Sequence, residues 1–112
     1  MKNLKVIIKN EFTILEDDYI YISTELKEFL QRFEVFGDII LTMIIYELSN
    51  GNKIIIDIEE LEDFFAFSID FLTSIASMDD YEYEINKERV NDKFYGILKE
   101  LVDKGYAESC NK

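Results

Sequence analysis

The first residues alternate between hydrophobic and polar side chains, which is the pattern of a half-buried β-strand. Leu4, Val6 and Ile8 lie on one side of this predicted strand, and lysines interrupt the other side. Two short apolar groups, FTIL and YIYI, follow on either side of the acidic residues 16–18. Short apolar runs around a polar turn indicate a hairpin. We therefore expect one strand and then a hairpin at the start of the chain.

Apolar residues then recur at spacings of three and four, which predicts helices. Thr24 is the expected N-cap of the first helix, and Gly37 is expected to end it. Asp38 can cap a second helix at residues 39–48, which is apolar almost all round and must be buried between other elements if it is helical. Its many β-branched residues leave a strand open as the alternative. The apolar face of the first helix is formed by Leu26, Phe29, Leu30 and Phe33.

A turn signal at residues 49–52 introduces a second clear strand, KIIIDIE. Within it, Ile54, Ile56 and Ile58 share one face because side chains alternate along a strand. Residues 61–78 place most of their apolar side chains on one broad arc of a helical wheel, so this segment is predicted to be a helix.

Strict alternation returns at residues 81–85, YEYEI, and predicts an exposed edge strand. Asn86 can cap the last helix, and Gly105 is well placed as the C′ residue after its end. The inward face of this helix is formed by Val90, Phe94, Ile97, Leu98, Leu101 and Val102.

The predicted order of elements, β-ββ-α-α-β-α-β-α, indicates an α+β (or α/β) fold, a single-domain mixed β-sheet with about four helices packed on it. No linker, internal repeat or low-complexity segment divides the chain, so residues 1–112 are expected to form one domain. The strand at residues 53–58, the helix after it and the strand at 81–85 are compatible with one right-handed crossover.

Composition and charge narrow the classes of function. The chain is 48% hydrophobic and carries a net charge of -12, so it can build a core while repelling phosphate backbones and anionic lipids. We therefore expect no direct binding of nucleic acid and no membrane association. Lys5 and Lys9 interrupt any signal-peptide core, and the lone Cys110 has no disulfide partner, which together favour a cytoplasmic protein.

The usual catalytic groups are missing from the sequence. Histidine, the commonest general base and metal ligand, does not occur, and the four glycines form no phosphate-binding loop. No serine lies in a nucleophile-elbow motif. The acids at residues 16–18, or Asp79, Asp80 and Glu82, could offer oxygen ligands to Mg²⁺ or Ca²⁺, but neither group has EF-hand spacing. We expect no enzymatic activity, no cofactor and no metal site. A carboxylate-metal enzyme is the alternative hypothesis for these acids.

Acidic residues are concentrated in one stretch of the chain. Residues 54–86 contain ten acids and no base, whereas residues 1–53 contain nine acids and six bases and residues 87–112 contain five acids and six bases. Such a run is either a solvated surface or a binding surface. Tyr81 and Tyr83 could anchor a partner, and Phe67, at the edge of the polar arc of its helix, is either an exposed anchor or a margin of the core. The predicted partner-binding residues are Asp57, Glu59, Glu60, Glu62, Asp63, Phe67, Asp70, Asp79, Asp80, Tyr81, Glu82, Tyr83 and Glu84.

We interpret the chain as a non-enzymatic acidic inhibitor that masks a basic surface of a partner enzyme. The expected surface is one that binds nucleic acid, as on a nuclease, which would make the chain a nucleic-acid mimic of the immunity-protein or phage anti-defence type. A homodimer that buries the helix from Ile39 or the strand from Tyr81 stays open as well.

The stretch NKIIIDIEELEDFFAFSIDFL resembles the central strand, loop and helix of STAS domains, the fold of anti-sigma-factor antagonists. With the preceding helix and the final LKELVDKGY segment, the resemblance covers about two thirds of the chain. Those regulators carry a phosphorylatable Ser or Thr followed closely by Gly, whereas Ser68 lies within FAFSIDF with no Gly after it. The resemblance implies a topology and an alternative function, a STAS-like signalling or scaffold module that binds through residues 59–73.

Overall fold

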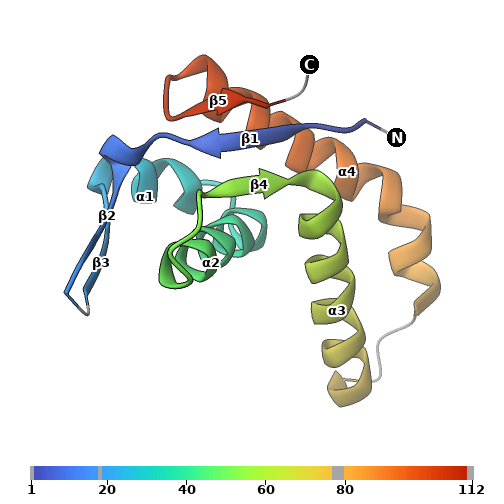
Figure 1. Cartoon of the computed structure of the whole chain (residues 1–112). Helices are drawn as coiled ribbons and strands as arrows, with labels where there is room; N and C mark the ends of the chain where they lie inside the picture. Colours follow the sequence, from blue (N-terminus) through green and yellow to red (C-terminus); the bar gives the residue numbers. More distant parts are fainter. Residues whose placement is uncertain (1, 18, 77–79, 111–112) are drawn as a thin grey trace.

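The amino-terminal strand forms the centre of a three-stranded antiparallel sheet (Figure 1). β1 (Lys5–Ile8) pairs on one side with β4 (Ile55–Asp57) and on the other with β5 (Ala107–Ser109). This computed structural model describes residues 2–17, 19–76 and 80–110, and the side chains of residues 68–87 lie outside the description. Because side chains alternate along a strand, Val6, Ile8, Ile54 and Ile56 are all buried on one face of the sheet.

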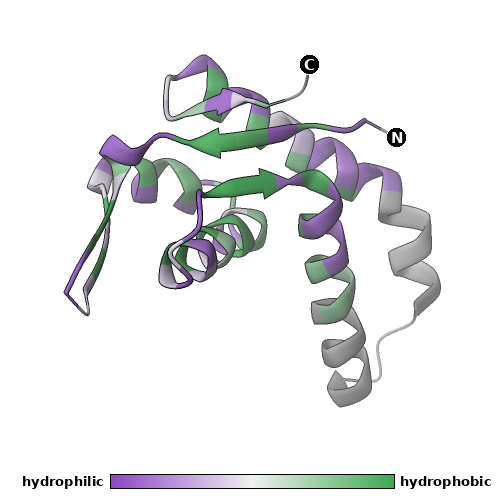
Figure 2. Ribbon diagram, viewed as in Figure 1, coloured by the Kyte–Doolittle hydropathy of each residue, from purple (hydrophilic) through white to green (hydrophobic). Residues whose placement is uncertain are grey.

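The helices α1 (Thr24–Gln31), α2 (Val35–Ser49), α3 (Ile58–Ala76) and α4 (Asp80–Asp103) account for most of the remaining described chain. They cover the buried face of the sheet, where Figure 2 shows hydrophobic residues along β1 and β4. The α+β class and the four helices predicted from the sequence are confirmed for the residues described here. The helices contribute to the core Leu26, Phe29, Leu30, Ile39, Ile40, Ile44, Ile58, Leu61, Val90, Phe94, Ile97, Leu98 and Leu101.

A separate hairpin, β2 (Thr13–Glu16) with β3 (Tyr19–Ile22), follows a short 3₁₀ helix, η1 (Asn10–Phe12). It extends away from the main sheet (Figure 1). Asp17, in its turn, has a φ of 53°, a left-handed conformation that Asp tolerates better than most residues. The predicted hairpin is confirmed, and its outer face exposes Ile14, Tyr19 and Tyr21.

The junction between α1 and α2 differs from the prediction. Ser23, not Thr24, caps α1, since its Oγ accepts a hydrogen bond from the Leu26 N–H at 3.2 Å. α2 is a helix and not a strand, and it begins at Val35, so Asp38 lies in its first turn and does not cap it. Gly37 does not end the first helix but lies inside the second. A Cβ there would stand 1.7 Å from the Leu30 carbonyl oxygen, so glycine is needed for two helices to approach closely.

Two helix ends form the Schellman arrangement, in which a glycine of positive φ lets two backbone N–H groups return to the last turn. After α4, the Gly105 N–H donates to the Val102 carbonyl oxygen and the Tyr106 N–H donates to that of Leu101. Gly51 ends α2 in the same way. The predicted role of Gly105 is confirmed. The predicted turn at residues 49–52 contains the second of these helix ends, at Gly51.

The predicted edge strand at residues 81–85 is wrong, because this segment is the beginning of α4. Asn86 consequently lies inside that helix and does not cap it. Acidic residues are favourable in the first turns of a helix, and extending an existing helix is easy, whereas an isolated strand needs a partner. The crossover is wrong for the same reason: α3 leads to α4, and the strand that follows is β5, which the sequence reading missed.

Candidate protein-binding groove

Two acids of the stretch at residues 54–86 are held by contacts within the protein. The Asp57 Oδ2 lies 3.7 Å from the Lys5 Nζ on the neighbouring strand, and its Oδ1 accepts a hydrogen bond from the Glu59 N–H. Glu62 accepts a hydrogen bond from the side-chain amide of Asn91. Asp57 has no basic neighbour in sequence, but strand pairing brings Lys5 to it. Part of the hydrogen-bonding and charge capacity of these two carboxylates is therefore used within the protein.

Three other acids of the stretch, Glu59, Glu60 and Asp63, are exposed in the first two turns of α3. None of them forms an ion pair with a residue that the structure describes. Negative side chains are favourable at this end of a helix because they face its positive dipole end. Glu60 and Asp63 are three residues apart and therefore lie on the same side of α3.

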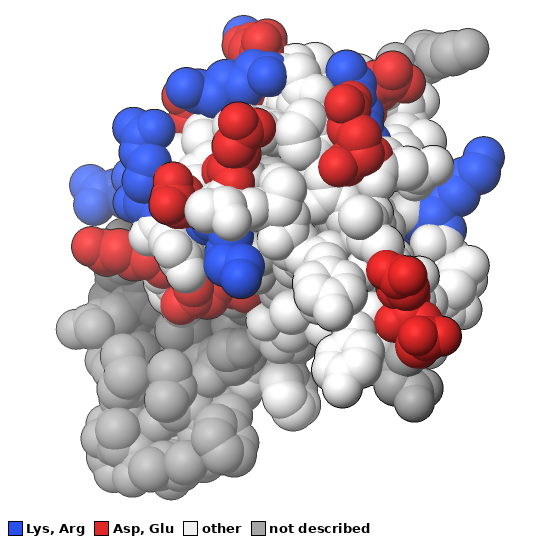
Figure 3. All heavy atoms as spheres, turned by 90° about the vertical axis from the view of Figure 1, so that its left-hand side faces the viewer, with Lys and Arg blue, Asp and Glu red and all other residues white. Residues whose placement is uncertain are grey.

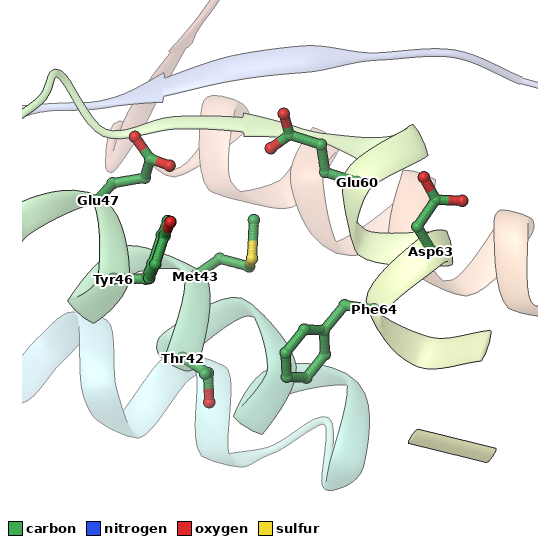
Figure 4. A pocket seen from close by; sticks show the side chains of 7 residues that line it. All are labelled: Thr42, Met43, Tyr46, Glu47, Glu60, Asp63 and Phe64. Carbon is green, nitrogen blue, oxygen red and sulfur yellow. The ribbon is translucent and has the colours of Figure 1, made fainter. Parts of the chain in front are cut away.

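That side of α3 borders a groove of about 480 Å³ between α2 and α3 (Figure 4). Met43 projects from α2 and Phe64 projects from α3 into the space between the two helices, and Tyr46 extends the apolar lining. The carboxylates of Glu47, Glu60 and Asp63 surround this lining, and Thr42 completes it. The groove thus combines an apolar floor with acidic rims on both helices.

Aromatic packing fixes the distance between the two walls of the groove. The ring of Phe36 from α2 stacks on that of Phe65 from α3, with centroids 5.4 Å apart and planes inclined by 6°. Both rings meet the buried Phe94 of α4 edge-on. Phe64 and Phe65 are neighbours in sequence, so Phe65 anchors α3 in the core while Phe64 reaches the groove.

Asn91 holds the other side of α3. It is 2% exposed, and its Nδ2 donates hydrogen bonds to Glu62 and to the Lys2 carbonyl oxygen, while its Oδ1 accepts one from the Lys2 N–H. Through these hydrogen bonds the buried amide connects α4 with α3 and with the segment before β1. This network holds the half-buried Glu62 against α4.

Two aromatic side chains near the groove are exposed. Tyr46, on α2, is 60% exposed, and Phe67, one turn beyond Phe64 on α3, is 70% exposed. Phe67 is therefore an exposed residue and not a margin of the core. Exposed aromatic residues beside acids are typical anchors of protein interfaces.

The side of the molecule that carries the hairpin has a different distribution of charge. Figure 3 shows basic and acidic groups intermingled over the upper part of that side. A hollow beside α1 is lined by Glu25 and Glu28 together with Arg32 and Lys104. Among the described residues, by contrast, the lining of the α2–α3 groove includes three acids and no base. Unneutralised negative charge is therefore a property of the groove.

The side chains of the other predicted binding residues lie outside the description. Asp79 is not described, and the remaining residues are described for their backbone alone, in α3 or α4. Their contribution to a surface stays a prediction. These residues are Asp70, Asp80, Tyr81, Glu82, Tyr83 and Glu84.

Among the described residues, no three acidic or cysteine side chains come close enough to hold a metal ion. Within the same part of the chain, no helix has both the length and the apolar character needed to cross a membrane.

The α2 wall of the groove was not predicted from the sequence. The helix at residues 39–48 was expected to be buried all round, but it buries Ile39, Ile40 and Ile44 and exposes Ile45 and Tyr46. One signal was present: a chain of this length has few elements with which to surround a helix that is apolar on every side. The apolar surplus of α2 is what lines the groove.

Comparison with known proteins adds no assignment: no family model, no curated protein and no solved structure matches the chain. The resemblance to STAS domains accordingly stays a prediction.

Proposed function

We propose that this protein is a non-enzymatic acidic inhibitor that binds a basic surface of a partner protein through the α2–α3 groove. The partner surface is one that binds nucleic acid, and the bound chain competes with nucleic acid for it. The observation that carries the proposal is the apolar groove whose rims carry Glu47, Glu60 and Asp63, with no basic residue among the described residues that line it.

Charge and apolar contact have separate roles in this proposal. Exposed carboxylates attract a basic partner at a distance and raise the association rate, by roughly 10- to 1000-fold in steered complexes. Buried aromatic and methionine contacts then hold the complex and slow its dissociation. Met43, Tyr46 and Phe64 provide such contacts, and Phe67 lies one helical turn further along α3.

The test is affinity capture from the native host with a charge-reversed chain and a matched control. Glu60→Lys/Asp63→Lys reverses two exposed groove acids three residues apart, the first of them in the first turn of a helix. Glu25→Lys/Glu28→Lys makes the same change at two exposed positions with the same spacing, beginning in the first turn of α1. Both variants have the same net charge, and in both the new lysines lie near the amino-terminal end of a helix.

We expect the unchanged chain and the α1 variant to capture the same basic protein, and the groove variant to lose it. Capture should weaken as salt is raised, because salt at 0.1 M screens the attraction between exposed charges that are farther apart than about 10 Å, and more salt shortens that distance. The purified chain should then release nucleic acid from that protein in an electrophoretic mobility assay. Equal capture by all three chains, or release of nucleic acid by none of them, would contradict the proposal.

A further inference from the structure

The walls of the groove present one row of side chains each. On α2, Met43 is followed by Tyr46 and Glu47, at three and four residues, and on α3, Glu60 is followed by Asp63 and Phe64 at the same spacings. Residues at these spacings lie on one line along a helix. The groove therefore lies between one such set of side chains from each helix, with Met43 and Phe64 between the helices and the carboxylates at its edges.

The walls offer hydrogen-bond acceptors but few donors. Backbone N–H and C=O groups inside a helix are bonded within it, and the one wall hydroxyl besides that of Tyr46, on Thr42, donates to the Asp38 carbonyl oxygen at 2.8 Å. An extended segment buried here would leave its own backbone carbonyls without donors, which is costly. A helical segment satisfies its own backbone and needs nothing from the walls.

We propose that the groove binds an amphipathic basic α-helix of the partner, an inference that rests on the proposed function. The apolar stripe of that helix lies against Met43, Tyr46 and Phe64, and methionine can adapt to side chains of different shape. Lysine or arginine residues flank the stripe on both sides, because Glu47 lies on one rim and Glu60 and Asp63 lie on the other.

The test uses designed peptides of about 18 residues, which is about five helical turns. The first contains leucine at helical spacing on one face and lysine elsewhere. The second has the same composition with its leucines spread around the helix, the third alternates leucine and lysine as in a strand, and the fourth replaces lysine by glutamate. Binding of each labelled peptide to the full chain is measured by fluorescence anisotropy, and helicity by circular dichroism.

We expect the striped basic peptide to bind at least about tenfold more tightly than the other three and to gain helicity when bound, a difference of about 1.4 kcal/mol. Tighter binding of the alternating peptide would overturn the inference in favour of strand addition. Equal binding of the scrambled peptide would overturn it in favour of charge alone, while leaving the proposed function intact. Tighter binding of the striped peptide, combined with equal partner capture by the groove variant and the α1 variant, would instead reject the proposed function.

A pair of tyrosines gives the matched control for location. Tyr46 in the groove is 60% exposed and Tyr21 on the hairpin is 53% exposed, so Tyr46→Glu and Tyr21→Glu make the same change at similar depth. Peptide affinity should fall about tenfold or more for the first and stay unchanged for the second. Equal effects would place the binding elsewhere and overturn the inference. Thr42→Lys, at an exposed groove position, replaces Tyr46→Glu if that variant loses its fold by circular dichroism.

Discussion

Replacing Gly37 by alanine should destabilise the protein, although alanine is the better helix former. Gly37 is buried in the first turn of α2, where that helix passes the end of α1. An added Cβ would stand 1.7 Å from the Leu30 carbonyl oxygen and 2.7 Å from the carbonyl carbon. The obstacle is backbone, and that same oxygen accepts hydrogen bonds from the Arg32 and Phe33 N–H groups. It cannot turn aside as a flexible side chain could.

The size of the effect follows from these distances. Relief to 3.0 Å, below which Cβ contacts essentially never fall, requires a movement of about 1.3 Å between the helices. Such a movement would disturb Phe36, whose ring packs on Phe65 and Phe94. Overpacking of this kind costs about 3 kcal/mol, and alanine returns about 1 kcal/mol of helix propensity. We expect a net loss of about 2 kcal/mol, or a fall in Tm of about 8 °C.

Gly96→Ala is the control, because Gly96 lies within α4 and nothing stands within 4 Å of its added Cβ. That variant should gain about 0.5–1 kcal/mol from the reduced freedom of the unfolded chain. Urea unfolding followed by circular dichroism measures both. If Gly37→Ala were as stable as the unchanged protein, the close approach of α1 and α2 would be refuted.

Two further changes test the contacts that hold the walls of the groove. Glu34→Gly should raise stability by about 1 kcal/mol in thermal unfolding, because Glu34 has φ 56° and ψ -129°, a region that glycine alone adopts readily; a loss would show that the junction is unstrained. Asn91→Ala should cost about 2 kcal/mol in urea unfolding, since it leaves Lys2 backbone groups and the Glu62 carboxylate without their partner. A cost below about 0.5 kcal/mol would show that water replaces the amide.

Local spacing was sufficient to identify most elements of the fold and their buried faces. The strand period correctly separated Ile54, Ile56 and Ile58, which are buried, from Ile55, which is exposed. The helical period did the same for the last helix, where Phe94, Ile97, Leu98 and Leu101 are fully or almost fully buried. These predictions succeed because a face that must leave water imposes its own period on the sequence.

Local spacing failed where two explanations share one pattern. Alternation at residues 81–85 fits a strand, but the chain there is part of a helix and pairs with none of the described strands. Gly37 fits the end of a helix, but glycine is required there because the backbone of α1 at Leu30 leaves no room for a Cβ. In both cases the deciding contact or its absence lies outside the local window.

The sequence by itself determined the α+β class, the periods of the elements and the concentration of acid in residues 54–86. Only the tertiary structure decided which of the described acids in that stretch are held within the protein, because Lys5 and Asn91 reach Asp57 and Glu62 from distant parts of the chain. It also placed α2 beside α3, so that apolar residues from one helix lie among the carboxylates of the other. The physical reason is that periodicity shows which face of each element is buried. A groove depends instead on which two faces the folded chain leaves partly uncovered beside each other.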